Sequence, residues 1–393
     1  MRPAARVEAA IELLDEIIAA AEREGAPADR LIAAYFRERR YAGSKDRRAV
    51  RELVYQAIRH CGPVPQTGRA AMLALAAQDE ALAALFDGST HAPRPIGEHE
   101  DAAKAGVAPQ WLVEALAKSG VSGEAAQAML GRAALDIRIN TLKADLDALE
   151  LPVAGEALAT PDALRLPAGT QVEQWEAYRD GQIEVQDFGS QLACIAAAAQ
   201  PGETVIDLCA GAGGKTLALA AAMQNQGKLL ACDTDRGRLS KLPPRAARAG
   251  AGLIETKLLD PGKELEMLSD NRASAEMVLV DAPCSGTGTW RRKPEAKWRL
   301  TPPRLKRFAE VQDRLLDIAA NLTKPGGRIV FVTCSLLDQE GADRAAAFLA
   351  RNPAWRAEQP DLPLGSRHGE GIRLDPYHHG TDGFFIAILR SSC

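Results

Sequence analysis

The sequence has few of the features that mark membrane, secreted or metal-binding proteins. No apolar run approaches the roughly 20 residues that a bilayer span needs. Glu8, Glu12 and Asp15 interrupt the apolar residues near the N-terminus, so we expect no signal peptide in that segment. Without an export signal, we expect the seven cysteines to stay reduced in the cytoplasm. They contain no CxxC pair, which disfavours a structural zinc site. We therefore expect a cytoplasmic protein with no membrane partner and no resident metal.

An excess of positive charge is also missing, since the formal net charge is −4 at pH 7, and this alone argues against a nucleic-acid partner. The basic residues are nevertheless clustered, and local positive potential is what phosphate binding requires. Composition leaves two alternatives open, a solvated surface and a phosphate-binding surface. The first basic cluster contains Arg37, Arg39, Arg40, Lys45, Arg47, Arg48 and Arg51, and the second contains Arg291, Arg292, Lys293, Lys297, Arg299, Arg304, Lys306 and Arg307.

A chain of 393 residues is too long for one ordinary core and predicts two or three domains. Ala-, Leu- and Glu-rich segments, with an amphipathic stripe over residues 7–24, predict an all-helical domain over residues 1–133. Alternation over residues 136–140, followed by Gly and Pro punctuation, predicts a small α/β subdomain over residues 134–190.

Over residues 191–393, short apolar runs alternate with segments long enough for crossover helices. This pattern predicts a Rossmann-like α/β domain, with a doubly wound and mainly parallel sheet. In such a fold, ligands bind beyond the carboxyl ends of the strands. We expect strands at residues 204–208, 229–232, 277–280, 328–332 and 384–389.

A glycine-rich loop, residues 209–216, follows the first of these strands. A phosphate-binding P-loop would need glycine where Cys209 stands, and a dinucleotide-binding loop would need it at Thr216, so both motifs fail. Asp233 ends the second strand, where an acid suits the two hydroxyls of a ribose. The pattern predicts a nucleoside with a non-phosphate tail, of which S-adenosylmethionine is the obvious candidate. A purely structural turn is the alternative.

Two cysteines, Cys284 and Cys334, follow the third and fourth expected strands, and a serine follows each. A lone cysteine in such a sheet is usually core, but two suit methylation of a pyrimidine ring. A thiolate that adds to carbon 6 makes carbon 5 nucleophilic toward a methyl sulfonium. The carbon-5 proton must leave before the thiol is eliminated, and a second thiol can assist. Asp281 is placed to bind ring nitrogen 3 and the amino group of the cytosine. Lys215 is a candidate for the nearby positive charge that favours the thiolate.

From about residue 138 onward, the sequence resembles the Sun/RsmB family of RNA cytosine-C5 methyltransferases of the 16S rRNA type. Two departures stand out. Gly211 and Ala212 replace the usual Ala-Pro of the family loop, which predicts a looser loop, and Pro243-Pro244 is expected to break the helix after Asp233. The motifs that carry the resemblance are residues 138–143, 185–191, 209–216, 281–288, 333–335 and 380–385.

The resemblance implies a role for each matching residue. Cys334 is the implied nucleophile, Cys284 the residue that assists product release, and Asp281 the group that activates the base. The family identifies S-adenosylmethionine as the cofactor. The implied cofactor-binding residues are Cys209, Ala210, Gly211, Ala212, Gly213, Gly214, Lys215, Asp233, Asp260 and Asp281.

Residues 36–48 resemble, more loosely, the NusB-like RNA-binding domain of bacterial family members, which implies RNA binding through phosphates and shape. Trp290 and Trp298 are expected to stack on unpaired bases. The implied RNA-binding residues are Arg37, Arg39, Arg40, Lys45, Arg47, Arg48, Arg138, Asn140, Arg291, Arg292 and Lys293.

The resemblance favours ribosomal RNA as the substrate of a monomeric enzyme, with a flipped or unpaired target base. Transfer RNA is the alternative substrate. A non-catalytic RNA-binding ribosome-assembly factor is the alternative function. A DNA cytosine methyltransferase is disfavoured because it would leave residues 333–335 unexplained.

Overall fold

The computed structural model describes residues 1–23 and 25–392 and divides into two compact units. The first contains Met1–Gly131 and Thr289–Thr301, and the second contains Arg132–Gly288 and Pro302–Cys393. Within the described ranges, every helix is too short or too polar to span a bilayer.

The first unit is helical because apolar residues recur at helical spacing and meet in one core. Its longest helix, α1, corresponds to the predicted stripe over residues 7–24 and packs against α2, α3 and α4. The core of α1 includes the fully buried Val7, Leu14 and Ile17. The helices are α1 (Pro3–Glu22), α2 (Ala28–Glu38), α3 (Ser44–His60), α4 (Gly68–Ala76), α5 (Glu80–Ala83), α6 (Gln110–Lys118) and α7 (Gly123–Ala128).

The segment Thr289–Thr301 also belongs to the helical unit, although the sequence placed it in the catalytic domain. It includes the 3-10 helix η5 (Pro294–Arg299), whose Trp298 lies in the helical core and donates its indole N–H to the Gly62 carbonyl at 3.2 Å. Trp290 and Trp298 are only 0% and 4% exposed. The expectation that they stack on RNA bases is therefore wrong for this structure, because an indole filling a core cannot also face solvent.

The second unit is built on a large sheet in the order β11-β12-β13-β9-β8-β5-β6-β7, with β10 pairing with β13. Strands β5 to β9 are parallel, and β13 runs antiparallel to β9. The five predicted strands correspond to β5, β6, β8, β9 and β13. The strands are β5 (Thr204–Asp207), β6 (Lys228–Asp233), β7 (Ile254–Leu258), β8 (Ala275–Asp281), β9 (Thr323–Thr333), β10 (Trp355–Glu358), β11 (Ser366–His368), β12 (Gly371–Leu374) and β13 (Phe384–Ser391).

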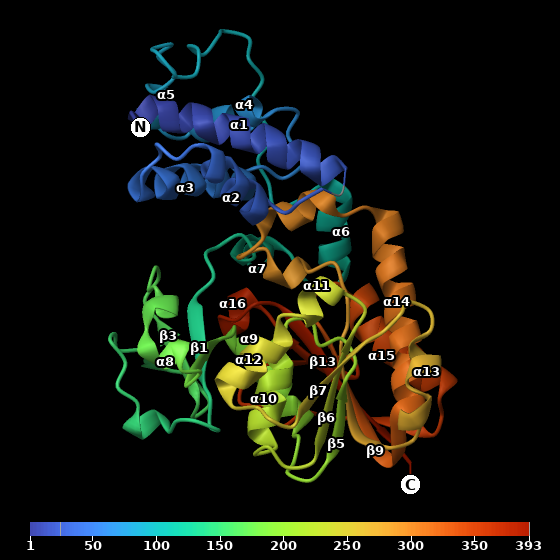
Figure 1. The fold of residues 1–393 in the computed structure, drawn as a ribbon. Coiled ribbons are helices and arrows are strands. Elements are labelled where there is room, and N and C mark those ends of the chain that lie inside the picture. The colour runs from blue at the N-terminus through green and yellow to red at the C-terminus, as the bar shows by residue number, and fades with distance from the viewer. Residues whose placement is uncertain (24, 393) are drawn as a thin grey trace. The chain divides into compact units, whose positions relative to one another are not determined.

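Helices cover both faces of this sheet, which makes the unit a three-layer α/β structure (Figure 1). Val205 packs with residues of α9, α10 and α12, whereas its neighbour Ile206 packs with α14 and α15. This alternation is what a strand buried on both sides requires. The helices are α9 (Phe188–Ala197), α10 (Gly214–Ala222), α11 (Arg236–Leu239), α12 (Leu242–Ala249), α13 (Glu264–Met267), α14 (Pro302–Leu322), α15 (Ala342–Arg351) and α16 (Pro376–His379).

The predicted break at Pro243-Pro244 is confirmed. Helix α11 ends at Leu239, and α12 begins at Leu242 with proline in its first turn. Proline is tolerated there because the first amide N–H groups of a helix have no intrahelical partner.

A small antiparallel sheet in the order β2-β3-β1-β4 belongs to the same unit as the large sheet. The sequence had separated the two sheets at residue 190. Ile137, Ile139 and Ile183 fill the small core. Its elements are β1 (Leu135–Ile139), β2 (Glu156–Ala157), β3 (Ala163–Leu166), β4 (Ile183–Val185) and α8 (Glu176–Arg179).

Candidate active site

The residues expected to carry chemistry gather at one edge of the large sheet. Strands β7, β6, β5, β8 and β9 are parallel neighbours in that order, so their carboxyl ends share an edge. Asp260 follows β7, and the glycine loop follows β5. The remaining residues stand at the ends of the other strands: Asp233 at β6, Asp281 and Cys284 at β8, and Cys334 at β9.

The glycine loop between β5 and α10 needs its glycines. Gly211 and Gly213 have φ of +56° and +88°, a left-handed region that favours glycine. A Cβ added to Gly211 would lie 2.4 Å from the Arg238 guanidinium, and one added to Gly213 would lie 2.1 Å from a Leu242 methyl. The backbone turn therefore depends on the absence of side chains at both positions.

The loop is also tied down, so the looseness expected from the Gly211-Ala212 replacement is not what the structure has. Asp233 accepts the Gly211 N–H at 2.7 Å through one oxygen and the Asp235 N–H at 2.7 Å through the other. Arg245 donates to the Ala212 carbonyl at 2.6 Å. These contacts fix the position of the loop, against which we expect the cofactor to lie.

Asp207, at the end of β5, is a candidate that sequence reasoning did not single out. It is fully buried, and one oxygen accepts the Thr216 hydroxyl at 2.7 Å. The other oxygen has no hydrogen-bond partner among the described residues. Burial raises the pKa of the Asp207 carboxyl to about 7. A buried acceptor beside the glycine loop suits a cationic or N–H-bearing ligand group. The signal available was its position two residues before the loop motif.

These observations test whether the site fits S-adenosylmethionine. Asp207 has one carboxylate oxygen without a hydrogen-bond partner among the described residues, and Asp260 is exposed at the same edge of the sheet. Among residues 1–23 and 25–392, no cluster of three or more His, Cys, Asp or Glu side chains could hold a metal. The donor set fits an organic nucleoside with a charged tail.

Lys215 and Asp281 form an ion pair that joins the glycine loop to the end of β8. The Lys215 ammonium lies 2.7 Å from an Asp281 carboxylate oxygen and 5.4 Å from the Phe384 ring centroid. Burial is the largest single influence and would lower the pKa of Lys215, but the charge and hydrogen bond of Asp281, together with Cys194 and Cys334, outweigh it and the pKa is raised. Cys334 contributes to the same rise, which places its sulfur within electrostatic range of the ammonium. The lysine is therefore a permanent cation in this site.

The structure brings the two predicted cysteines together. The Cys284 and Cys334 sulfurs lie 3.4 Å apart, and both side chains are partly exposed. The hydrogen bond to Cys334, burial and nearby negative charge together raise the pKa of the Cys284 thiol. By contrast, Cys61, Cys194 and Cys232 are buried, and burial raises the pKa of Cys194 to about 11. Cys393 lies outside the described residues.

The RNA-binding residues expected in the middle of the chain are enclosed by protein. Arg138 donates to the Gln186 side chain at 2.9 Å. Asn140 donates to the carbonyls of Gly181 and Ala249, at 2.7 and 2.8 Å. Both side chains are buried. Asn140 connects the small sheet to its surroundings, whereas Arg138 also lines a cavity of about 610 Å³. In the second cluster, Arg291 is buried as well, whereas Arg292 and Lys293 are exposed.

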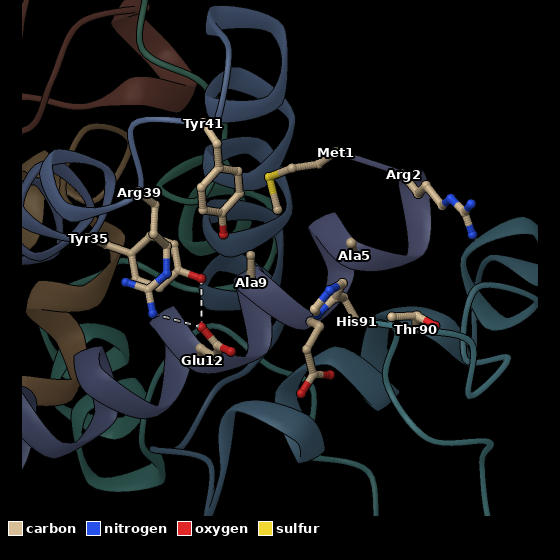
Figure 2. A pocket seen from close by; sticks show the side chains of 11 residues that line it. Met1, Arg2, Ala5, Ala9, Glu12, Tyr35, Arg39, Tyr41, Thr90 and His91 are labelled. Carbon is tan, nitrogen blue, oxygen red and sulfur yellow. Dashed lines mark hydrogen bonds and ion pairs between the residues drawn. The ribbon is translucent and has the colours of Figure 1, made fainter.

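The first basic cluster is more accessible and lies beside a cavity of about 740 Å³ in the helical unit (Figure 2). The Arg39 guanidinium lies 3.6 Å from the Tyr35 ring centroid, and both side chains donate to Glu12. Tyr41, which also lines the cavity, is 74% exposed. The remaining basic residues of the cluster are exposed, namely Arg37, Arg40, Lys45, Arg47, Arg48 and Arg51.

Comparison with known proteins agrees with this site. Residues 194–390 match the family model described as 16S rRNA methyltransferase RsmB/F. Ribosomal RNA small subunit methyltransferase B from Enterobacter sp. is 32% identical over 305 residues, which cover 75% of this chain and 69% of that protein. The protein of the same name from Thermus thermophilus is 39% identical over 211 residues, 53% of this chain and 50% of that one. The chain spans about two thirds of the length of the first curated relatives, 66% for one from Bacillus subtilis.

Solved structures show the same fold. The crystal structure of PH0851 matches with a TM-score of 0.75 and 25% identity, covering 99% of each chain. That of NSun6 from Pyrococcus horikoshii with SFG matches with a TM-score of 0.65 and 20% identity, covering 72% of this chain and 98% of that one. The expected doubly wound fold and the expected cofactor, S-adenosylmethionine, are confirmed. The chain belongs to the Sun/RsmB family of S-adenosylmethionine-dependent methyltransferases.

Proposed function

We propose that this protein methylates carbon 5 of a cytosine in ribosomal RNA, in the cytoplasm, through a covalent intermediate on Cys334. One observation carries the proposal: two cysteine sulfurs lie 3.4 Å apart at the same sheet edge as the glycine loop and the Lys215–Asp281 ion pair. Two adjacent thiols beside a cofactor loop suit a reaction that needs both a nucleophile and a group that assists release.

The first step is attack by the Cys334 thiolate on carbon 6 of the cytosine. A bond forms between the sulfur and carbon 6, and the electron pair of the ring double bond makes carbon 5 nucleophilic. Lys215 supports this step because its permanent positive charge favours the thiolate. Asp281, held in place by Lys215, is the residue proposed to bind ring nitrogen 3 and the amino group.

S-adenosylmethionine supplies an electrophilic methyl group to carbon 5. The proton on carbon 5 must then be removed by a base so that the carbon 5–carbon 6 double bond can re-form. As it re-forms, the bond between carbon 6 and sulfur breaks, and Cys334 leaves as a thiolate. Cys284 assists this release, which its contact with the Cys334 sulfur makes possible.

The substrate proposal rests on the relatives, which are ribosomal RNA small subunit methyltransferases. The exposed basic residues on α2 and α3 are proposed to bind RNA phosphates together with Arg292 and Lys293. Transfer RNA is the second candidate substrate. We further propose that the protein acts as a monomer.

Covalent trapping tests this function. Wild type, Cys284→Ala and Cys334→Ala are incubated with S-adenosylmethionine and total bacterial RNA and run on denaturing gels. Cys284→Ala should accumulate a protein–RNA adduct and Cys334→Ala should form none, and sequencing of the trapped RNA identifies the substrate. An adduct in Cys334→Ala would reverse the two roles. No adduct in any variant, together with no methyl transfer by wild type, would favour an RNA-binding assembly factor without catalytic activity.

A further inference from the structure

The cavity that Arg138 lines lies in the second unit, away from the candidate active site. Its volume of about 610 Å³ falls within the range of roughly 300–1,000 Å³ that is usual for pockets that bind small organic molecules. Its walls come from β1, α9, α10 and the loop that precedes β3. The described residues that line it include neither the cofactor loop nor the two reactive cysteines. The reaction proposed above therefore gives this cavity no role.

The first polar group in the cavity is a buried guanidinium. Arg138 is 8% exposed, and its Nε donates to the Gln186 amide oxygen at 2.9 Å, while its Nη1 lies 3.4 Å from the Ile139 carbonyl oxygen. Among the residues that the structure describes, Nη2 has no hydrogen-bond partner and the guanidinium has no ion pair. A guanidinium does not lose its proton on burial, so its remaining N–H groups require acceptors.

Two acceptors accompany this donor. Gln191 is 3% exposed, and its amide nitrogen donates to the carbonyls of Ile137 and Gln186, at 3.2 and 2.8 Å. Because these two bonds fix the orientation of the amide, its oxygen faces away from them and has no partner in the described ranges. The half-buried Asp162 carboxylate also lacks a hydrogen bond or ion pair to any described residue. Both side chains line the cavity.

Much of the remaining lining is apolar and small. Ala218 and Ala221 on α10 and Ala199 after α9 present only methyl groups, and Ile195 on α9 is 42% exposed. A flat ring can bury its faces against such side chains while its edge meets the polar groups. A cavity that holds only water is the alternative.

Guanine matches these donors and acceptors best among the four RNA bases. Its O6 and N7 are adjacent acceptors that an arginine recognises, and its N1 and N2 carry three N–H bonds for carboxylate and carbonyl oxygens. Adenine and cytosine offer a single amino group as donor, and uracil offers a single N–H. We propose that this cavity is a guanine-binding site, in which Arg138 donates to the base and Gln191 and Asp162 accept from it.

The base belongs either to single-stranded RNA or to a free guanine nucleotide, and the chemistry of recognition is the same for both. In the first case the site is a second contact with the substrate, and this part of the inference rests on the proposed function. Binding of the free nucleoside does not depend on methyl transfer, so it can be tested separately.

The test is nucleoside binding to the full-length protein, measured by isothermal titration calorimetry. Saturating S-adenosylhomocysteine is present throughout, so that the cofactor site is filled. Guanosine should bind about tenfold more tightly than inosine, which lacks the N2 amino group, because one unmade hydrogen bond to a buried acceptor costs about that factor. Adenosine and cytidine should bind more weakly again.

Substitutions around the cavity locate the site. Asp162→Asn replaces an acceptor by an amide and should weaken guanosine binding about tenfold. Ala222→Trp, at an exposed position that lines the cavity, should block it and abolish binding. Asp147→Asn, at an exposed position between β1 and β2 and outside the lining, should change nothing. Arg138→Lys should weaken binding about tenfold, and if this variant fails to fold, Asp162→Asn and Ala222→Trp still decide the question.

Competition with RNA identifies the source of the base. Displacement of guanosine by a single-stranded RNA, but not by the same RNA with adenine at every guanine position, would assign the site to RNA. Displacement by neither would assign it to a free guanine nucleotide, and displacement by both would overturn the preference for guanine.

Two results would overturn the site itself. These are guanosine binding no tighter than adenosine binding, and guanosine binding that is unchanged in Ala222→Trp. The cavity would then hold only water. Absence of methyl transfer by wild type, with guanosine binding intact, would count against the proposed function alone.

Discussion

Lys215 in the second unit and Lys297 in the helical unit are both buried, and they differ in what surrounds the ammonium group. Lys215 lies 2.7 Å from the Asp281 carboxylate, and its pKa is raised. Lys297 forms a long hydrogen bond of 3.5 Å to the Arg59 carbonyl, and burial lowers its pKa to about 7. A buried lysine is a permanent cation beside a carboxylate and a titrating group without one, and sequence spacing does not distinguish these cases.

The largest expected effect comes from removing the Lys215 cation. Lys215→Met leaves Asp281 without its ion pair and Cys334 without a nearby positive charge. We expect methyl transfer to fall about 10²–10³-fold, the size typical of losing one preorganised charge from an active site. The measurement is transfer of labelled methyl groups to RNA. Lys241→Met, an exposed lysine outside the site, is the control. A loss of less than about threefold would mean that the ion pair is structural.

The second prediction concerns stability and uses the other lysine. The folded pKa of Lys297, about 7, lies below its ordinary value of 10.5. Between those values Lys297 binds more protons in the unfolded chain, so its contribution makes the stability of the helical unit rise as the pH rises from about 7 toward 10.5. Lys297→Met should remove this dependence and stabilise the unit at pH 7 by a few kcal/mol, since no buried cation has to be desolvated.

Hydrogen exchange in urea at several pH values measures this effect in the helical unit of the full chain. The neighbouring groups leave the range from pH 7 to pH 9 clear. Burial lowers the pKa of His60 from 6.5, so His60 titrates below that range in both states. Burial raises the pKa of Cys61 from 9.0 to about 11, so Cys61 opposes the rise in stability only above about pH 9. Lys293→Met, at an exposed position in the same segment, should change little. A wild-type stability that is flat from pH 7 to pH 9 would contradict the assignment.

The sequence could predict features that depend on neighbouring residues, and it could not predict contacts between distant parts of the chain. Strands β5, β6, β8 and β9 each contain a short apolar run that is followed by turn residues. Because these strands are parallel, the order of the residues that carry the chemistry follows from the sheet. β7 was missed because it is a half-exposed edge strand of mixed polarity, Ile-Glu-Thr-Lys-Leu. The contact between the Cys284 and Cys334 sulfurs depends on the strand order β5-β8-β9, and this order cannot be read from the spacing of the motifs in the sequence.

The failures concern residues whose surroundings come from distant parts of the chain. Trp298 packs in the helical core and donates to the carbonyl of Gly62, which lies 236 positions away in the sequence. Arg138 lies on β1, where residues 136–139 are all buried, and Asn140 follows the strand directly and is buried too. Their basic or polar character suggested contact with RNA.

The third prediction separates structural polar residues from RNA-binding ones. Asn140→Ala leaves the carbonyls of Gly181 and Ala249 without its amide N–H groups and should cost about 1–3 kcal/mol of stability. RNA affinity measured well below the melting temperature should not change. Asn225→Ala is the matched control, because Asn225 donates to the Gly250 carbonyl at 2.8 Å from an exposed position and should cost much less. A specific loss of RNA affinity in Asn140→Ala would restore it as an RNA-binding residue.

The smallest effect is expected on the exposed surface of the helical unit. Arg37 and Arg40 are exposed, unlike Arg39, which stacks on Tyr35 and donates to Glu12. Each phosphate contact on single-stranded RNA contributes about 0.7 to the slope of log affinity against log salt. Replacing both exposed arginines by alanine should therefore lower the slope by about 1.4 without changing stability, as filter binding at several salt concentrations would measure. Lys118→Ala, an exposed basic position outside the cluster, should leave the slope unchanged, and an equal drop in that control would mean that net charge and not this surface governs RNA binding.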